Sequence, residues 1–290
     1  MDPVAQQTWN VRKLSAADLE DCYLLSTEAG WNQTRSDWLF IIENSDAYGV
    51  EDKKGQVIAT SVAFSLKETR WIAMVLVASD WRGRGLAGVL LKALGLGEPG
   101  GSPDYLDATK FGAPLYERRG FAGVGTIFRY QGEGRGPSPE SDMIGAALKI
   151  SENEDLAALV EGWEKEASVA VWCPKVLDYL VSVAPEHCLA FNKENDRAAI
   201  WVRPGRLAWE IGPLIASDTE SAQRILDACL ASLEGPVVID VHGHETAFLR
   251  ILEERGFSPV REFERMCCGI ELSAEESGMT RYATAGPDFG

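Results

Sequence analysis

Residues 82–87 read Arg-Gly-Arg-Gly-Leu-Ala and stand between an apolar strand pattern and an apolar helix pattern. Gly83 and Gly85 let the backbone turn sharply and bring its N–H groups close to a ligand. The helix that follows begins with unpaired N–H groups and the positive end of its dipole, a geometry that binds pyrophosphate. Because two arginines add positive charge, we expect a phosphate-binding corner rather than a glycine turn without a ligand.

Two common nucleotide-binding motifs do not fit this corner. A P-loop would need Lys-Ser or Lys-Thr after the second glycine, and Leu86 stands there. A dinucleotide fold would need GxGxxG and an acidic residue about 20 residues further on, at the end of a second parallel strand. Here the strands that precede the loop look antiparallel, so a different strand–loop–helix fold is indicated.

The corner resembles motif A of the GNAT superfamily of N-acetyltransferases, whose pattern is Arg/Gln-Gly-x-Gly-x-Gly/Ala. Residues 115–121, LYERRGF, resemble the Leu-Tyr-x-x-x-Gly-Phe ending of that family, and the element order of residues 10–130 resembles its fold. Residues 29–38 and 285–290 also resemble a bacterial tandem-GNAT subgroup. In that subgroup the N-terminal domain is intact and the C-terminal domain is degenerate.

The resemblance implies acetyl-CoA, or another acyl-CoA, as donor, and no metal. Pyrophosphate would lie on the backbone N–H groups of residues 82–87, and pantetheine would pair like an extra strand with the edge of residues 76–79, near Val77. Such an arrangement matches the splayed fourth and fifth strands of the family. The residues implied in binding the donor are Leu76, Val77, Arg82, Gly83, Arg84, Gly85, Leu86, Ala87, Thr109 and Leu115.

Amine attack on a thioester builds negative charge on the carbonyl oxygen and then expels a thiolate. A backbone N–H near Val77 or Ala78 could stabilise that oxygen. Tyr116 is the candidate catalytic residue, because a phenol with a pKa of about 10 is protonated at neutral pH and can donate to the leaving sulfur. The alternative is that Tyr116 only packs within a short helix.

Several residues are candidates for the acceptor side. Trp31 and Asn32 follow the first predicted helix, where GNAT proteins line the acceptor site, and Asp37 is grouped with them; Trp31 is equally explained as a core anchor. An ammonium must lose a proton before it attacks, and Glu28, Asp37 and Asp107 are the carboxylates considered for that step. Each is also typical of a cap or surface position, so the base stays open.

The composition restricts the partners. The chain has 290 residues, 46% of them hydrophobic, and a net charge of −16. Such an acidic chain is a poor nucleic-acid binder, because phosphate contacts need Lys and Arg, and a GNAT acting on RNA is therefore disfavoured. No apolar signal segment or window of transmembrane length is found, so we expect a cytoplasmic protein without a membrane partner, as a monomer or a homodimer.

Other residues that could bind metals do not form a pattern. His242 and His244 would face one side of a strand, but no third ligand is evident, and a polar turn explains them better. The six cysteines lack a CxxC pair and are typical of reduced thiols in a cytosolic protein. We therefore predict no metal site.

Alternating and amphipathic runs predict the elements that position these residues. Helices are expected at 15–29, 34–44, 85–96, 113–119, 152–167, 174–184, 219–233 and 245–256, and strands at 8–14, 47–52, 55–66, 69–79, 103–109, 121–130, 146–151, 187–193, 197–204, 206–216, 236–242 and 257–272. The fold class is α/β with two tandem GNAT-like domains, each a twisted, mostly antiparallel sheet flanked by helices. We place a catalytic domain at 8–131, a Gly/Pro/Ser-rich linker at 132–143, a degenerate domain at 144–272 and a tail at 273–290.

Three matches between the halves indicate a duplication. LVASD at 76–80 matches LIASD at 214–218, LDA at 106–108 matches IDV at 239–241, and ERRGF at 117–121 matches EERGF at 253–257, all at nearly one offset. The second copy lacks the glycines and arginines of the corner, and Leu252 stands where the first copy has Tyr116. We therefore expect the chemistry in the N-terminal copy only.

The C-terminal copy would be a structural partner that walls the acceptor site, through residues 208–215 and 281–290. The expected function is transfer of an acetyl group from acetyl-CoA to a primary amine. The alternative is an acyl-CoA-binding or sensory module without catalysis. The acceptor stays open among a small amine, an amino acid, an aminoglycoside-like antibiotic and a peptide or protein lysine.

Overall fold

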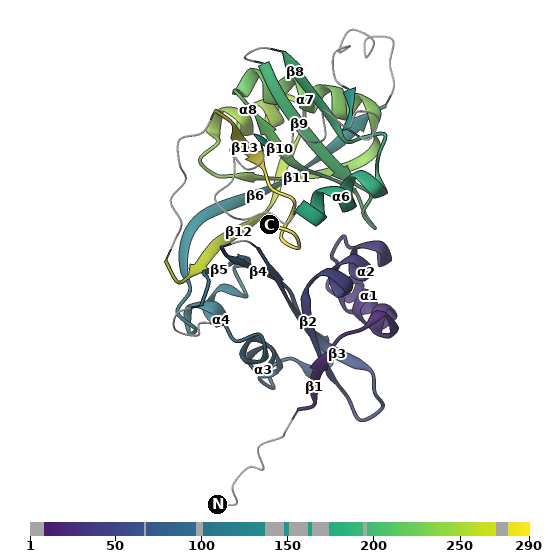
Figure 1. Ribbon diagram of the computed structural model, residues 1–290, viewed down its shortest axis with the longest axis vertical. Coiled ribbons are helices and arrows are strands. Elements are labelled where there is room, and N and C mark those ends of the chain that lie inside the picture. The colour runs from purple at the N-terminus through teal and green to yellow at the C-terminus, as the bar shows by residue number, and fades with distance from the viewer. Residues whose placement is uncertain are drawn as a thin grey trace, which may run out of the picture.

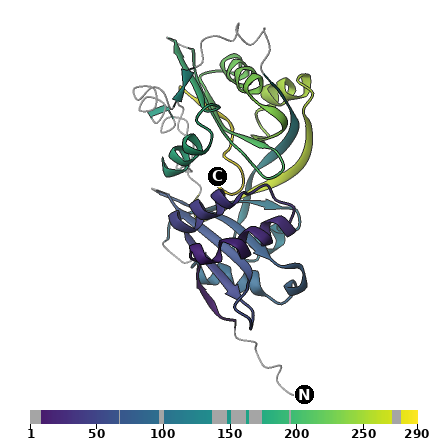
Figure 2. The same ribbon diagram turned by 90° about the vertical axis from the view of Figure 1, so that its right-hand side faces the viewer.

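The computed structural model describes residues 9–66, 68–96, 101–136, 148–150, 162–163, 174–193, 196–270 and 278–290. In these residues the strands form one mixed sheet of 13 strands, in the order β1-β2-β3-β4-β5-β12-β6-β11-β13-β10-β9-β8-β7. Two long strands, β6 and β12, join the two halves of the molecule, and helices flank the sheet in both halves (Figures 1 and 2). The predicted α/β class with flanking helices is confirmed, but the two sheets expected, one in each half, are joined into a single sheet.

The N-terminal half contains β1 (Val11–Lys13), η1 (Ala16–Asp18), α1 (Leu19–Glu28), α2 (Arg35–Asn44), β2 (Asp46–Glu51), β3 (Val57–Ser65), β4 (Arg70–Val77), η2 (Ser79–Trp81), α3 (Leu86–Ala93), β5 (Asp104–Thr109), α4 (Ala113–Glu117) and β6 (Ala122–Arg135). Strands β1 to β4 pair antiparallel in chain order. Helices α1 and α2 lie on one face of these strands and α3 lies on the other (Figure 1). Consecutive residues of β3 point to opposite faces, so Phe64 joins the core under α2 and Ala63 joins the core under α3.

The C-terminal half repeats this order with β7 (Leu148–Lys149), α6 (Pro174–Val183), β8 (Leu189–Lys193), β9 (Asp196–Arg203), β10 (Trp209–Ala216), α7 (Thr219–Ser232), β11 (Glu234–His242), α8 (Thr246–Glu254), β12 (Ser258–Cys268) and β13 (Thr280–Ala283). The helix predicted at 152–167 lies outside the described residues apart from Gly162 and Trp163, which are helical. Strands β10 and β11 run parallel, as β4 and β5 do in the first half.

The two halves exchange their last strands. Strand β12 ends the C-terminal half but pairs antiparallel with β5 of the N-terminal half, through Phe263 to Cys268. Strand β6 ends the N-terminal half but pairs antiparallel with β11 along its length, from Ile127 to Arg135. The two exchanged strands also pair with each other. Each half therefore depends on a strand from the other to complete its part of the sheet.

The predicted start of the linker is wrong, because residues 132–135 belong to β6. Their glycines serve close packing. A Cβ at Gly132 would lie 2.7 Å from the ring of Phe257. A Cβ at Gly134 would lie 2.9 Å from the Cβ of Leu233. The composition that resembles a linker thus reflects a strand crowded from one side. Residues 137–143 of the predicted linker lie outside the described residues.

The predicted C-terminal tail contains a strand that the sequence pattern did not predict. Strand β13 pairs antiparallel with β10, from Leu214 to Ala216, and its Ala283 pairs with Val241 of β11. Since β10 and β11 pair directly only from Trp209 to Ile211, β13 fills the space where they separate. The chain then continues toward the N-terminal half, so its C-terminus lies between the halves (Figure 1).

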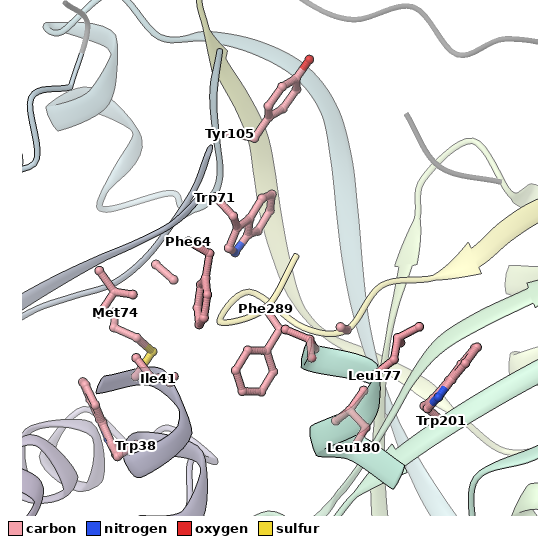
Figure 3. Close-up of a cluster of buried hydrophobic side chains, with 14 of the residues drawn as sticks. Trp38, Ile41, Phe64, Trp71, Met74, Tyr105, Leu177, Leu180, Trp201 and Phe289 are labelled. Atoms are coloured by element: carbon pink, nitrogen blue, oxygen red, sulfur yellow. The ribbon is translucent and has the colours of Figure 1, made fainter. Parts of the chain in front are cut away.

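A shared apolar core joins the halves. The ring of Phe289 lies between Phe64 of β3 and the α6 residues Leu177 and Leu180 (Figure 3). Its centroid is 6.0 Å from that of Phe64 and 5.9 Å from that of Tyr179. The last residues of the chain are therefore part of the core. None of the helices in the described residues has the length and apolar character needed to cross a membrane.

Candidate active site

A cavity opens where β4 and β5 separate. The two strands pair in parallel only at Arg70 and Trp71, with Asp104 and Tyr105, and then diverge. The cavity has a volume of about 940 Å³ and is lined by residues 72–77 of β4 and 106–109 of β5. This is the splay that the family resemblance implied, formed by the strands on which it was expected.

An irregularity in β4 helps to open the splay. The register between β3 and β4 shifts between Thr60 and Val62, and Met74 of β4 has a φ of 52°, in the left-handed region that few non-glycine residues adopt. The hydroxyl of Thr60 donates a 2.8 Å hydrogen bond to the Met74 carbonyl and holds this conformation. A bulge of this kind bends the strand, here between its paired and its splayed part.

The glycine loop presents a row of free amides to the cavity. Gly83 and Gly85 have φ values of 75° and 81°, and a Cβ at either position would have no atom within 4 Å, so backbone conformation and not crowding requires glycine. Within the described residues, the N–H groups from Gly83 to Gly88 have no hydrogen-bond acceptor, while Val89 N–H begins the helical pattern by donating to Gly85. Such a row at a helix N-terminus is suited to an anion.

The two arginines of the loop fix its shape. Arg82 Nε donates to the Val77 carbonyl at 3.0 Å and thus ties the loop to the end of β4. Arg84 Nη2 donates to the Asp80 carbonyl at 3.0 Å, and its guanidinium lies 4.8 Å from the centre of the Trp81 ring. Arg82 lines the cavity and Arg84 does not.

Two backbone amides, those of Val77 and Ala78, were considered as donors to the thioester carbonyl oxygen. The Ala78 N–H already has an acceptor, because it donates to the Ile58 carbonyl at 2.9 Å. Hydrogen-bonding residues alternate along an antiparallel pair. The N–H of Val77, which pairs in register with Ala59, therefore points to the opposite edge of β4, toward the splay. The cavity-lining Val77 is thus the one of the two that can donate there.

Tyr116 lies on α4 and lines the same cavity. Its side chain is 8% exposed and packs edge-on against Phe121, with ring centroids 5.8 Å apart. Burial raises the pKa of the Tyr116 phenol above its ordinary value, so the group is protonated at neutral pH. No hydrogen-bond partner of this hydroxyl is present among the described residues, which leaves its proton available to a ligand. Thr109 at the end of β5 and Leu115 of α4 also line the cavity.

Trp31 and Asn32 line the cavity but also attach the C-terminal half to it. The Asn32 amide nitrogen donates to the Ala208 carbonyl at 3.0 Å and to Glu210 Oε2 at 3.1 Å, and its oxygen accepts from the N–H groups of Leu207 and Ala208. All hydrogen-bonding positions of this side chain are therefore occupied. The Trp31 carbonyl accepts from the Arg206 guanidinium at 3.1 Å. Leu207 and Ala208 line the cavity, so of the predicted wall segment 208–215 only its first residue reaches it.

The three carboxylates considered as a base are all engaged elsewhere. Asp37 does not line the cavity; its carboxylate begins α2 by accepting from Thr34 and is buried 2.9 Å from Arg203. This placement contradicts a direct contact with the acceptor. Glu28 accepts from the N–H of Ser79 at 2.8 Å. Asp107 lines the cavity with both oxygens bonded to Arg265, at 2.8 and 2.9 Å.

Gln33, Arg129 and Asp288 are among the polar residues of the cavity wall that sequence reasoning missed. Gln33 Nε2 donates to Asp288 Oδ2 at 3.0 Å across 255 positions of sequence. Arg129 donates to Asp240 at 2.6 Å and to Glu210 at 2.9 Å. No local pattern marks such contacts; the available signal was the resemblance of residues 29–38, which include Gln33, and of residues 285–290, which include Asp288, to the tandem subgroup.

Comparisons with known proteins agree with this architecture. Residues 175–279 match the family model described as an acetyltransferase (GNAT) domain. The chain is 24% identical over 252 residues to the uncharacterized N-acetyltransferase YitH of Bacillus subtilis, a match covering 84% of this chain and 86% of the relative. Residues 175–279 thus match a GNAT domain, and most of the chain is similar to a protein named as an N-acetyltransferase.

Solved structures show the same GNAT fold. A putative acetyltransferase from Pyrococcus horikoshii superposes with a TM-score of 0.81 at 18% identity, over 100% of this chain and 99% of that one. A GCN5-related N-acetyltransferase from Sphaerobacter thermophilus has a TM-score of 0.62 at 17% identity, over 92% and 98% of the two chains. The tandem arrangement of two GNAT-like halves is therefore found in other proteins.

In the second GNAT-like half, other groups occupy the positions equivalent to the phosphate-binding helix N-terminus, the splay and Tyr116. The carboxylate of Asp218 caps α7 by accepting from the N–H of Ser221 at 2.7 Å, so the helix N-terminus already has its anion. Strand β13 fills the splay between β10 and β11. Leu252 is fully buried where the first half has Tyr116. The family model matches this half, whereas the glycine loop belongs to the other half, and the cavity is lined by residues of both.

The rings of His242 and His244 lie 5.2 Å apart, centre to centre. The residues that the structure describes contain no group of three or more His, Cys, Asp or Glu side chains that could hold a metal ion.

Proposed function

We propose that this protein transfers an acetyl group from acetyl-CoA to a primary amine, and that the reaction takes place in its N-terminal half. The observation that carries this proposal is the combination of free amides at Gly83–Gly88 with the unpaired, protonated hydroxyl of Tyr116 around one cavity. The general class, an acyltransferase of the GNAT superfamily, rests on the comparisons above. The proposal adds three things to this class: acetyl-CoA as the donor, a primary amine as the acceptor, and the N-terminal half as the place of the reaction.

The residues around the cavity fit acetyl-CoA. The amides of Gly83–Gly88 would donate to the diphosphate oxygens, and the edge of β4 beyond Trp71, which has no strand partner on that side, would pair with the pantetheine amides. When bound, acetyl-CoA supplies an activated acyl thioester. The Val77 N–H would then stabilise the carbonyl oxygen as negative charge develops on it.

Tyr116 completes the reaction by protonating the leaving sulfur. An acceptor that arrives as an ammonium first releases one proton to solvent. The neutral amine then attacks the thioester carbon, the carbon–sulfur bond breaks, and the thiolate takes the phenolic proton. The proton lost by the new amide nitrogen restores the phenol through solvent, so the net products are the amide and free CoA. Because burial raises the pKa of Tyr116, the phenol holds its proton until the thiolate forms.

The test is the release of free thiol from acetyl-CoA with a panel of amines, in the wild type and in Tyr116→Phe. Loss of a general acid lowers rates by about 10²–10⁴-fold, so kcat should fall by roughly 10²-fold or more while the KM for acetyl-CoA changes little. Tyr130→Phe is the matched control, since Tyr130 bonds to Glu253 and does not line the cavity. Equal rates in Tyr116→Phe and wild type would remove the assigned role.

The alternative is a module that binds acyl-CoA without turnover. The unpaired hydroxyl of Tyr116 favours the enzyme, because a binding module has no need for a proton donor beside the thioester. Tight binding of acetyl-CoA, together with no thiol release on any amine of the panel, would support the module.

A further inference from the structure

The C-terminal turn brings a carboxylate into the cavity and holds it there. Gly290 N–H donates to the Gly286 carbonyl at 2.9 Å, and Trp71 Nε1 of β4 donates to the Pro287 carbonyl at 3.1 Å. Figure 3 shows this turn beside Trp71, with Phe289 anchored in the core. Asp288 lies between these anchors, is 2% exposed and lines the cavity. Its position is therefore rigidly determined.

Gln33 faces Asp288 from the other end of the chain. It is 5% exposed and also lines the cavity. Its Nε2 donates to Asp288, and because an ionised carboxylate can only accept, this bond fixes which end of the amide is the oxygen when Asp288 is charged. That oxygen, Oε1, is buried and has no hydrogen-bond donor among the residues that the structure describes. A buried acceptor left without a donor costs about 1–3 kcal/mol, so the site lacks an N–H or O–H partner.

The surroundings of Asp288 carry too few positive charges. Arg203 Nη2 lies 2.7 Å from Asp288, but the same guanidinium also lies 2.9 Å from Asp37 and 2.9 Å from Glu210. The second guanidinium of the cluster, Arg129, is shared between Glu210 and Asp240. Two arginines thus face four buried carboxylates. Buried charge without compensation is costly, so this cluster favours an additional cation or a proton.

The protonation behaviour of Asp288 agrees with this charge balance. Burial, followed by the negative charges of Glu210 and Asp37, raises the pKa of Asp288 to about 7, although Arg203 acts in the opposite direction. The other carboxylate that lines the cavity, Asp107, is matched one-to-one by Arg265 and has no such deficit.

We propose that Gln33 and Asp288 bind the ammonium group of the acceptor. Gln33 Oε1 and the less engaged oxygen of Asp288, Oδ1, would accept its N–H bonds, and the ammonium would supply positive charge that the cluster lacks. The same cavity is also lined by apolar side chains from both halves, among them Trp31, Leu207 and Val260. The acceptor class is therefore a small cationic amine with an apolar body, in preference to a neutral molecule of the same shape. This inference rests on the proposed function, because it places the acceptor in the same cavity as acetyl-CoA.

The test measures thermal stabilisation by four probes: butylamine, 1,4-diaminobutane, phenethylamine and 2-phenylethanol. At millimolar concentration at least one amine should raise the Tm of the wild type, and 2-phenylethanol, the neutral counterpart of phenethylamine, should not. Asp288→Asn and Gln33→Met should each remove the amine-induced shift and raise the KM for an accepted amine at least tenfold. Both should leave the KM for acetyl-CoA unchanged.

Tyr179→Phe is the matched control, because Tyr179 donates to Asp37 in the same charge cluster but does not line the cavity. It should keep the amine-induced shift. Gln33→Met keeps all the ion pairs, so it tests the site even where Asp288→Asn folds poorly. A shift that survives in Gln33→Met, or no shift with any amine in the wild type, overturns the assignment. Since Tm reports binding without turnover, this result is separate from failure of the thiol-release assay.

Discussion

Arg203 and Asp288 form a buried ion pair at 2.7 Å between β9 and the C-terminal turn. The same guanidinium contacts Asp37 of α2 at 2.9 Å. One side chain therefore connects the N-terminal half, the C-terminal half and the last residues of the chain. The cavity lies beside this connection, so its shape depends on the docking of the two halves.

Replacement of Arg203 by methionine should destabilise the whole chain. The change leaves Asp37, Glu210 and Asp288 buried without their shared cation, and breaking a buried ion pair in this way costs about 3–5 kcal/mol. Urea denaturation followed by tryptophan fluorescence measures the loss. Arg35→Met, which removes an exposed pair with Glu20, should leave the midpoint close to that of the wild type. Equal midpoints for the two variants would contradict the connecting role.

Replacement of Gly85 by alanine should weaken binding of acetyl-CoA at least tenfold. The φ of 81° costs an alanine about 1–2 kcal/mol, and relief of that strain would turn the amides of the loop away from the diphosphate. Titration calorimetry with acetyl-CoA measures the change. Gly55→Ala is a control with the same local strain, since its φ is 83° and no atom lies within 4 Å of its Cβ. Gly55 does not line the cavity, so affinity should be retained there.

A fragment of residues 1–140 should not fold to a stable, active protein. It would leave β5 without β12 and β6 without β11, which exposes two long sheet edges. It would also lack Phe289 and the Arg203 cluster. Expression followed by size-exclusion chromatography and circular dichroism tests this expectation. A monomeric fragment that retains full kcat and acceptor preference would show that the second half is dispensable.

The stability of the chain should depend on pH through Asp288. Because its pKa of about 7 lies above the ordinary value for aspartate, the folded chain binds this proton more tightly than the unfolded chain. The stabilising contribution is complete below the unfolded pKa and is lost as pH rises through about 7. The charged and titratable groups that surround it are Asp37, Arg129, Tyr179, Arg203, Glu210 and Asp240.

Urea unfolding between about pH 5 and about pH 8 checks this dependence. The free energy of unfolding of the wild type should fall over this range relative to that of Asp288→Asn, in which the titration is absent. Comparison with the variant removes the contributions of histidines that titrate in the same range. A difference that stays constant with pH would contradict the raised pKa of Asp288.

Local patterns in the sequence were sufficient for the elements and for the loop. Alternation and helical periodicity are properties of neighbouring residues, so most strands and helices and the order of the two halves could be predicted. The GNAT fold was implied by the resemblance of residues 82–87 and 115–121 to that family. Gly83 and Gly85 need positive φ for reasons internal to the loop, so the corner is recognisable from residues 82–87 alone. The roles assigned to Tyr116 and to the loop in binding the donor stay predictions until the assays are made.

Only the tertiary structure decided which strand pairs with which. The pleat of β6 is the same whether it pairs within its own half or with β11, so its sequence does not identify the partner. For the same reason residues 280–283 gave no sign that they would fill a splay, and the local sequence around Gly132 is typical of a linker although Phe257 packs against it. The contacts of Gln33, Asn32 and Asp288 span 175 residues or more, and no local pattern can encode a contact whose partner is chosen by the docking of two halves.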